Sequence, residues 1–255
     1  VTAACRNYCR SAEWLAMTFF AQAKLDGGKK PTLHIFGDTA CVEMFQRWNK
    51  KEPTLFEAGH LTLTDIMQLE LLSSAIHMKK ACNTIRMFLP RLLPDIHKFM
   101  YIDSDTIVVD SLRPLFRAPM SVYMMGEDGG THYFDQKATV NCPSWRNGTR
   151  VVDGPCHPFE HGLNDGVYLI DMDRWRALNL DAFFDYWVPQ ILDGSAQFTY
   201  SEQDIFNLLT VQHPEYLTTL PCEANTLPYN RWMCYFGNGS HSGWKSSSFE
   251  LRRNS

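Results

Sequence analysis

Two aspartates, Asp103 and Asp105, follow a run of apolar residues in the stretch Lys98–Asp110, which reads KFMYIDSDTIVVD. Residues two apart on a strand point to the same face, so the two carboxylates converge if the extended backbone continues through them. Like charges that close repel and raise one pKa unless a cation lies between them. At the C-terminal end of a buried strand, the pair predicts a site for Mn²⁺, or alternatively Mg²⁺, with positions left for phosphate oxygens.

Two other interpretations of this stretch are open. An Asp-Ser-Asp sequence also suits an ordinary acidic turn, and D-x-D is common by chance. Phosphatases of the haloacid-dehalogenase type end a strand in D-x-D-x-T and use the first Asp as nucleophile. Here Thr106 comes one place too early for that motif, and a complete β-α-β-α unit precedes it, so the metal interpretation is favoured.

A second cluster is GLNDGVYLID, residues 162–171, which predicts a tight polar turn leading into a strand at Val167–Ile170. Gly166 permits close backbone approach, and the Asn164 amide offers both a donor and an acceptor, which suits sugar hydroxyls. The alternative is a turn with no role beyond connecting two elements.

A third cluster is SEQDIFN, residues 201–207, which opens a helix. Ser201 and Asp204 form a capping-box-like pair, and that alone can explain the segment. In the functional interpretation, Glu202 and Gln203 project from the start of the helix into the same cleft as Asp103.

The elements that must position these clusters alternate as strand and helix, which predicts an α/β domain with a mostly parallel, Rossmann-like central sheet flanked by helices. Ser11 is the expected N-cap of the first helix, and residues 126–162 show little periodicity. The expected strands are Val1–Cys5, Thr32–Phe36, Lys98–Ile102, Ser121–Met125 and Val167–Ile170. The expected helices run from Ser11 to Asp26, from Thr39 to Trp48, from Thr64 or Asp65 to Pro90, from Asp173 onward and from Ser201 onward.

Composition bounds the function. A chain of 255 residues with net charge −4 can bury one large core and carries no basic footprint for nucleic acid. No apolar run is long enough to span a membrane. The chain begins at Val1 within an expected strand, which predicts a fragment whose targeting segment or membrane anchor lies upstream. Eight cysteines and two N-x-S/T sequons, at Asn147 and Asn238, favour the lumen of the secretory pathway; the cysteine pairing stays open.

The ordered set YIDSDTIVVDSLRPLF, GLNDGVYLIDMDRWR and SEQDIFNLL resembles the retaining glycosyltransferases of family 8, which carry a D-x-D, a G-x-N-S-G-V-x-L-like turn and a D-Q-D-x-x-N-like helix start. Lys79–Pro90 resembles the helix of these enzymes whose Arg reaches the donor. Pro221-Cys222, Tyr229-Asn230 and Cys234 are most similar to the glucoside xylosyltransferases. The resemblance implies a single GT-A type domain over 1–255, with a nucleotide-binding half at 1–110 and a donor-sugar and acceptor half at 111–255.

What the resemblance implies for the site can be placed on this sequence. Nucleotide-sugar binding falls to Ala4, Cys5, Arg6, Arg86, Asp103, Ser104, Asp105, Asn164, Asp165, Gly166 and Gln203; metal binding to Asp103 and Asp105; and catalysis to Gln203 and Glu202. The implied reaction moves xylose or another sugar from a UDP-sugar to a glycan or glycoprotein acceptor. It retains the anomeric configuration by front-face attack, depends on Mn²⁺, and takes place in the Golgi or endoplasmic-reticulum lumen. The implied protein is anchored as a type II membrane protein.

Three departures from the family pattern support a competing hypothesis. Glu202 stands where Asp is usual, Asp165 stands where Ser is usual, and the third metal ligand, a late His, is not identifiable; His241 is the nearest candidate. A catalytically silent relative that binds a nucleotide sugar or glycoprotein without transfer is therefore the alternative to an active transferase.

Overall fold

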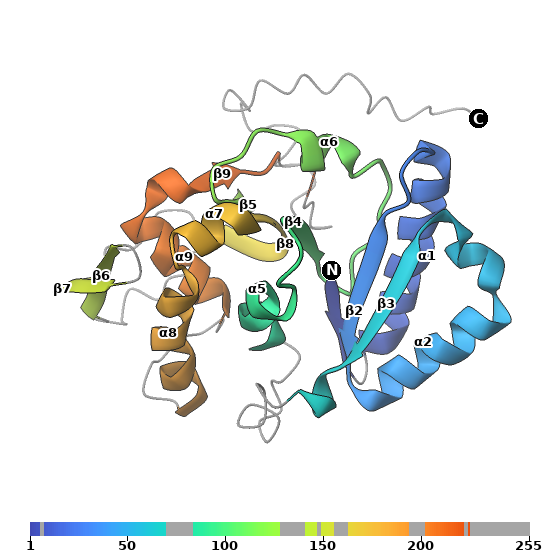
Figure 1. The fold of residues 1–255 in the computed structure, drawn as a ribbon, viewed down its shortest axis with the longest axis horizontal. Coiled ribbons are helices and arrows are strands. Elements are labelled where there is room, and N and C mark those ends of the chain that lie inside the picture. The colour runs from blue at the N-terminus through green and yellow to red at the C-terminus, as the bar shows by residue number, and fades with distance from the viewer. Residues whose placement is uncertain are drawn as a thin grey trace, which may run out of the picture.

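The computed structural model describes residues 1–5, 8–69, 84–127, 141–146, 149–155, 163–193, 202–221 and 224. Figure 1 shows a parallel sheet with α1 and α2 at one end of the molecule, and α8, α9 and the β6–β7 hairpin at the other. Strands β4, β8 and β5 lie between these two ends and join them.

The strands are β1 Thr2–Ala4, β2 Thr32–Gly37, β3 His60–Asp65, β4 Lys98–Ile102, β5 Tyr123–Glu127, β6 Asn141–Arg146, β7 Thr149–Pro155, β8 Leu163–Asp171 and β9 Leu217–Thr219. The α-helices are α1 Cys9–Asp26, α2 Thr39–Lys51, α5 Leu89–Leu92, α6 Arg113–Arg117, α7 Met172–Ala177, α8 Asp181–Asp193 and α9 Glu202–Gln212. The 3₁₀ helices are η2 Pro53–Ala58, η3 Ile66–Gln68, η5 Ile85–Phe88 and η6 Pro214–Tyr216.

The N-terminal sheet has the order β1-β2-β3 and is parallel throughout. Gly37 ends β2 where a Cβ atom would come within 3.1 Å of the Ala4 carbonyl oxygen, so a side chain would crowd the edge between β1 and β2. Asp38 then caps α2 by accepting a hydrogen bond from the Cys41 backbone N–H. A disulfide between Cys9 and Cys41 ties the start of α1 to the start of α2, with 5.4 Å between their Cα atoms.

Removing this disulfide should destabilise the domain. Cys9 and Cys41 are 32 residues apart, and a closed loop of that length restricts the unfolded chain by about 3–4 kcal/mol in the chain-entropy treatment. The paired substitution Cys9→Ala/Cys41→Ala should lower the free energy of unfolding, measured by urea titration, by about 2–4 kcal/mol. An unchanged urea midpoint would contradict the expectation.

The second sheet has the order β4-β8-β5-β9, in which β8 is antiparallel to both β4 and β5 and β5 is parallel to β9. Two hydrogen bonds join it to the first sheet: the Val1 nitrogen donates to the Met100 oxygen at 2.7 Å, and the Ile102 nitrogen donates to the Val1 oxygen at 2.9 Å. That pattern is the parallel one, so β1 and β4 run side by side and their C-terminal ends share an edge. The expected α/β fold with a parallel sheet flanked by helices is thus observed, and the half that contains β8 is mixed.

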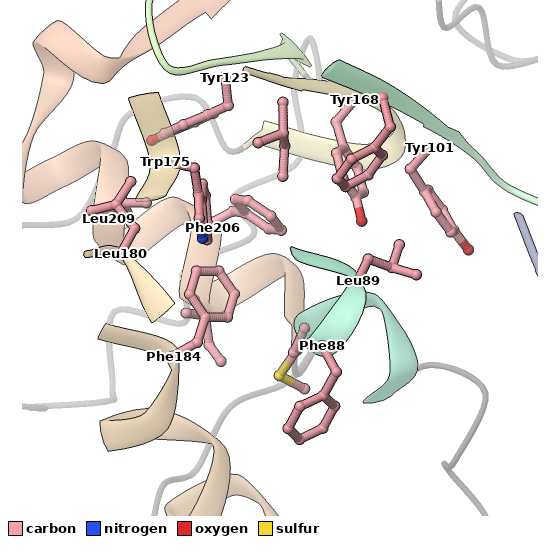
Figure 2. Packing of buried hydrophobic residues seen from close by; sticks show 14 of the residues in the cluster. Phe88, Leu89, Tyr101, Tyr123, Tyr168, Trp175, Leu180, Phe184, Phe206 and Leu209 are labelled. Atoms are coloured by element: carbon pink, nitrogen blue, oxygen red, sulfur yellow. The ribbon is translucent and has the colours of Figure 1, made fainter. Parts of the chain in front are cut away.

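Both faces of the second sheet are buried, and they differ in character. On one face, Tyr101, Tyr123 and Tyr168 pack with Trp175 of α7 and Phe206 of α9 in the largest apolar cluster. Figure 2 shows the Tyr101 and Tyr168 rings side by side, and their centroids are 4.9 Å apart with nearly parallel planes. On the other face, aliphatic residues of β4, β5 and β8 pack around Leu15 of α1. Because apolar clusters pack on both faces of the sheet, the position of β4 and of its C-terminal end is fixed.

Several boundaries and elements differ from those expected. Helix α1 begins at Cys9 with Tyr8 before it, so Ser11 lies inside the helix and is not its N-cap. The segment His60–Asp65 is strand β3, which was not among the expected strands. Asp65 does cap a helical turn, η3, but the backbone is extended at Leu69, so one continuous helix to Pro90 is wrong. Residues 70–83 lie outside the described part.

Further elements of the structure were not among those expected. Residues 126–162 were expected to lack regular structure, yet they contain the antiparallel pair β6–β7 with Arg146 opposite Thr149. Helix α8 was not expected, and it carries Pro189 in its interior. In the part of the chain that the structure describes, no helix is both long enough and apolar enough to cross a membrane.

Candidate functional site

The first aspartate of the D-x-D motif lies just beyond the last residue of β4. The Asp103 N–H donates to the Gly166 oxygen at 2.7 Å, and the Thr106 N–H donates back to the Asp103 oxygen at 3.1 Å, which closes a turn. Ser104 is buried, Asp103 is half-buried and Asp105 is exposed. The expectation that both carboxylates share one face of an extended strand is therefore wrong, since the strand has ended and they lie in a turn.

Arg86, from η5, binds the first carboxylate directly. Its Nη2 lies 3.0 Å from Asp103 Oδ1, and its Nη1 lies 3.0 Å from Asp165 Oδ2. The guanidinium side chain is 12% exposed and lies over the Tyr101 ring, with Cζ 5.0 Å from the ring centroid. The Tyr101 hydroxyl donates to Asp103 Oδ1 at 3.1 Å. One guanidinium thus bridges two carboxylates that are 62 residues apart in the sequence.

Strand β8 brings Asp165 to this point through an irregularity. Met125 of β5 pairs with Tyr168, but the next residue, Gly126, pairs with Asn164, so the residues between are left without partners on β5. Such a bulge redirects side chains and is common beside active sites. The Asn164 side-chain oxygen accepts from the Gly166 N–H at 2.9 Å and stabilises the bulge. These residues, expected in a turn before the strand, therefore lie within it.

Helix α9 supplies an amide. The Gln203 Oε1 accepts a hydrogen bond from the Asp165 N–H at 3.4 Å, so the Nε2 must point elsewhere. In the described part of the chain, this buried Nε2 has no hydrogen-bond partner. A buried N–H group without a partner is costly, so this donor is available to a ligand that reaches it.

Asn207 ties α9 to β8. Its Oδ1 accepts from the Leu163 N–H at 2.8 Å, and its Nδ2 donates to the Gln203 backbone oxygen at 3.0 Å. Asn207 and Tyr101 are functional candidates that sequence reasoning did not name. A signal existed for Tyr101, because it is two residues before Asp103 and so lies on the same side of the strand.

The pKa values follow from burial and from these charges. Burial raises the pKa of Asp103 to about 6; Arg86 acts in the opposite direction, and Asp165 and Asp105 add to the rise. Burial likewise raises the pKa of Asp165, again opposed by Arg86. The pKa of Tyr101 lies well above its ordinary value because its ring is buried.

A pH dependence of stability follows for the metal-free protein. Because the pKa of Asp103 is raised in the folded state, its contribution to stability is fully present below about pH 4 and is lost as the pH rises through about 6. Relative to Asp103→Asn, the unsubstituted protein should therefore gain about 1 kcal/mol of unfolding free energy on going from pH 7.5 to pH 5. Urea titrations of both proteins in chelator at the two pH values measure this gain; an equal difference at both would contradict the assignment.

The other expected site residues are placed as follows. Ala4 is buried at the C-terminal end of β1, on the edge it shares with β4, and Cys5 follows it in a disulfide. Glu202 is the first residue of α9, and only its backbone is described. Arg6, Ser201, the Lys79–Cys82 segment and His241 lie outside the described residues. So do the Asn147 and Asn238 sequons.

The carboxylates present suit a divalent cation by charge and ligand type, but Asp103, Asp105 and Asp165 do not all lie within 4.8 Å of one another. Asp103, Asp105 and Asp165 carry three negative charges against the single positive charge of Arg86, and burial already raises the pKa of two of them. The guanidinium acts as a stand-in cation at Asp103. Hard oxygen ligands with two uncompensated negative charges match Mn²⁺ or Mg²⁺.

Solved structures define the class of the fold. The chain is similar to a galactosyltransferase, LgtC, solved with donor and acceptor sugar analogues: TM-score 0.59, 21% identity, 91% of this chain and 76% of that one. It is also similar to mouse xyloside xylosyltransferase 1, with TM-score 0.57, 18% identity and coverage of 87% and 84%. The α/β fold is therefore that of the GT-A type glycosyltransferases.

Sequence comparison identifies the family. The model of the family described as glycosyl transferase family 8 matches residues 3–251, and the chain belongs to this family. Glucoside xylosyltransferase 2 of Mus musculus is 23% identical over 92% of this chain and 52% of its own length. Glucoside xylosyltransferase 1 of Danio rerio is 24% identical over 69% of this chain and 43% of its own length. The chain spans about half the length of these curated relatives.

Proposed function

We propose that the chain transfers a sugar, xylose or another pentose or hexose, from a UDP-sugar to a glycan or glycoprotein acceptor with retention of configuration. The observation that carries the proposal is the bridge from Asp103 through Arg86 to Asp165, with Gln203 hydrogen-bonded to the Asp165 backbone. The bridge supports a cation site at Asp103 with a guanidinium and an amide beside it. The family membership supports transfer from a nucleotide sugar.

Each group has a role in this proposal. Asp103 and Asp105 would hold Mn²⁺, or alternatively Mg²⁺, which supplies Lewis-acid stabilisation of the departing diphosphate. Arg86 donates hydrogen bonds to the donor phosphates or sugar from a fixed position. The Gln203 Nε2 donates to the donor sugar, and Asn164 and Gly166 line the same edge. Positioning and electrostatics then carry most of the catalysis.

The two halves expected from the sequence remain part of the proposal: residues 1–110 bind the nucleotide, and residues 111–255 bind the donor sugar and the acceptor. The roles implied above for Ala4, Cys5, Arg6, Ser104 and Glu202 also remain part of it. The disulfide between Cys9 and Cys41 supports a Golgi or endoplasmic-reticulum lumenal site, because disulfides persist in oxidising compartments.

A panel of UDP-sugars tests the proposal. We expect UDP-xylose, UDP-glucose or another member to raise the melting temperature in the presence of Mn²⁺ and not in EDTA. The same donor should be hydrolysed slowly without acceptor, with release of UDP. A metal-independent response to every donor, or none at all, would overturn the proposal.

The second candidate is a silent relative. Asp165, which replaces the usual Ser, is bound to Arg86, a group assigned to the donor. Metal-dependent binding of a UDP-sugar without hydrolysis or transfer would favour this alternative.

A further inference from the structure

Asp165 is nearly fully buried, with 8% of its side chain exposed, and it shares Arg86 with Asp103. Burying a carboxylate is costly unless it is paired and hydrogen-bonded, and here the Arg86 Nη1 does both at 3.0 Å. A buried ion pair of this kind is weak support for fold stability by itself. Asp165 shares the Arg86 guanidinium with Asp103, the proposed metal ligand, so this pair needs another explanation.

The guanidinium is a planar fork, and its two terminal nitrogens serve different carboxylates. Nη1 faces Asp165 and Nη2 faces Asp103, while the Tyr101 ring lies under the plane. A divalent cation that binds Asp103 through Oδ1 competes with Nη2 for that oxygen. The cost of that exchange depends on whether Arg86 keeps a second carboxylate after it leaves Asp103.

We propose that Asp165 is a positioning residue that retains Arg86 beside the diphosphate site when Asp103 exchanges the guanidinium for a divalent cation. Asp165 draws part of the guanidinium's charge away from Asp103 and leaves the Asp103 carboxylate more available to the metal. This role rests on the proposed function, because it needs a cation at Asp103.

The backbone of the same residue adds a second link. The Asp165 N–H donates to Gln203 Oε1 at 3.4 Å, while its side chain holds Arg86. The bulge in β8 turns the two groups of Asp165 toward these two partners. One residue thus sets the position of the guanidinium and the orientation of the amide.

The test measures Mn²⁺ binding to the whole chain without nucleotide, from the electron paramagnetic resonance signal of free Mn²⁺. Asp165→Asn keeps the shape and removes the charge, and Asp165→Ser removes both charge and bulk in case the amide is not tolerated. Each should weaken Mn²⁺ binding about tenfold. The matched control is Asp173→Asn, which removes one exposed negative charge. Asp173 contacts His97, the residue before the N-terminal end of β4, whereas Asp103 follows the C-terminal end. This substitution should change Mn²⁺ binding less than twofold.

A loss of that size could also come from the charge of Asp165 acting directly on the metal. The Arg86→Gln background separates the two explanations, since positioning through Arg86 requires Arg86. We expect Asp165→Asn to change Mn²⁺ binding less than threefold in that background. An equal loss in both backgrounds, or no loss with Arg86 present, would overturn the inference and leave the proposed function standing. A chain that binds neither Mn²⁺ nor UDP would overturn both.

Discussion

Asp103→Asn should abolish sugar transfer and metal-dependent UDP binding while the fold persists. The amide keeps the shape of the side chain but offers a neutral oxygen where the cation needs an anionic ligand. We expect the transfer rate to fall at least about a thousandfold, equivalent to about 4 kcal/mol of transition-state stabilisation. Calorimetric titration of UDP with and without Mn²⁺, and a coupled assay of UDP release, measure the two losses.

The structure predicts that this substitution costs little stability. Burial raises the pKa of Asp103 to about 6. At pH 7.5 the carboxylate is therefore charged, and this charge lowers the stability of the metal-free fold. The substitution removes that charge but also removes one partner of Arg86, which keeps Asp165. The free energy of unfolding should stay within about 1 kcal/mol.

The control for Asp103 is Asp110→Asn, which removes an exposed carboxylate seven residues further along the same segment. Among the described residues, the Asp110 side chain accepts a local hydrogen bond from the Ser111 N–H and no other. Transfer and UDP binding should be unchanged in this variant. Full activity in Asp103→Asn would show that Asp103 is not a metal ligand, and unfolding would show that its role is structural.

The local part of this site could be predicted from the sequence. Asp103 and Asp105 could be named as candidates because residue type and spacing after an apolar strand are readable along the chain, and the structure joins Asp103 to Arg86. Strand β4 was expected with the bounds observed. A strand that is buried on both faces appears in the sequence as a short continuous apolar run, here Phe99–Ile102. The turn that carries the pair was not predictable, since it depends on the Asp103 bond to Gly166 in another strand.

The pairings between distant segments could not be predicted. Arg86 and Asp165 are 79 residues apart, and nothing local to either one indicates that they meet. The bulge that presents Asp165 arises from the register of β8 against β5, which is set by packing on both sheet faces. Long-range contacts of this kind decide the site but leave no periodic trace.

Two missed elements did leave readable signals. The β6–β7 pair brackets an Asn147-Gly148 dipeptide, the sequence that most strongly favours a two-residue hairpin connection. In β3, Leu61 and Leu63 alternate with threonines, which is the pattern of a half-buried strand. Both segments are polar in composition, which is typical of connections, and this composition obscures the strand signals. Burial in the assembled sheet, and not propensity, decides such strands.

Gln203→Ala should give the second large loss, and of a different kind. The Gln203 Oε1 accepts a hydrogen bond from the Asp165 N–H, and its Nε2 is a buried donor with no partner in the residues described. A preorganised donor of this kind typically contributes a hundredfold or more to turnover. We expect kcat to fall about 100-fold, and the affinity for UDP, which lacks the sugar, to change less than about threefold.

The matched control lies on the same helix. Gln212, at the last position of α9, also has a buried side-chain amide with no hydrogen-bond partner among the described residues. Gln212→Ala should leave kcat unchanged, and urea titration of both variants separates a loss of stability from a loss of turnover. Because both substitutions truncate the same side chain on one helix, a loss of kcat confined to Gln203→Ala can come only from its place beside Asp165. Equal losses of kcat in the two variants, or an equal loss of UDP affinity and kcat in Gln203→Ala, would remove Gln203 from the catalytic site.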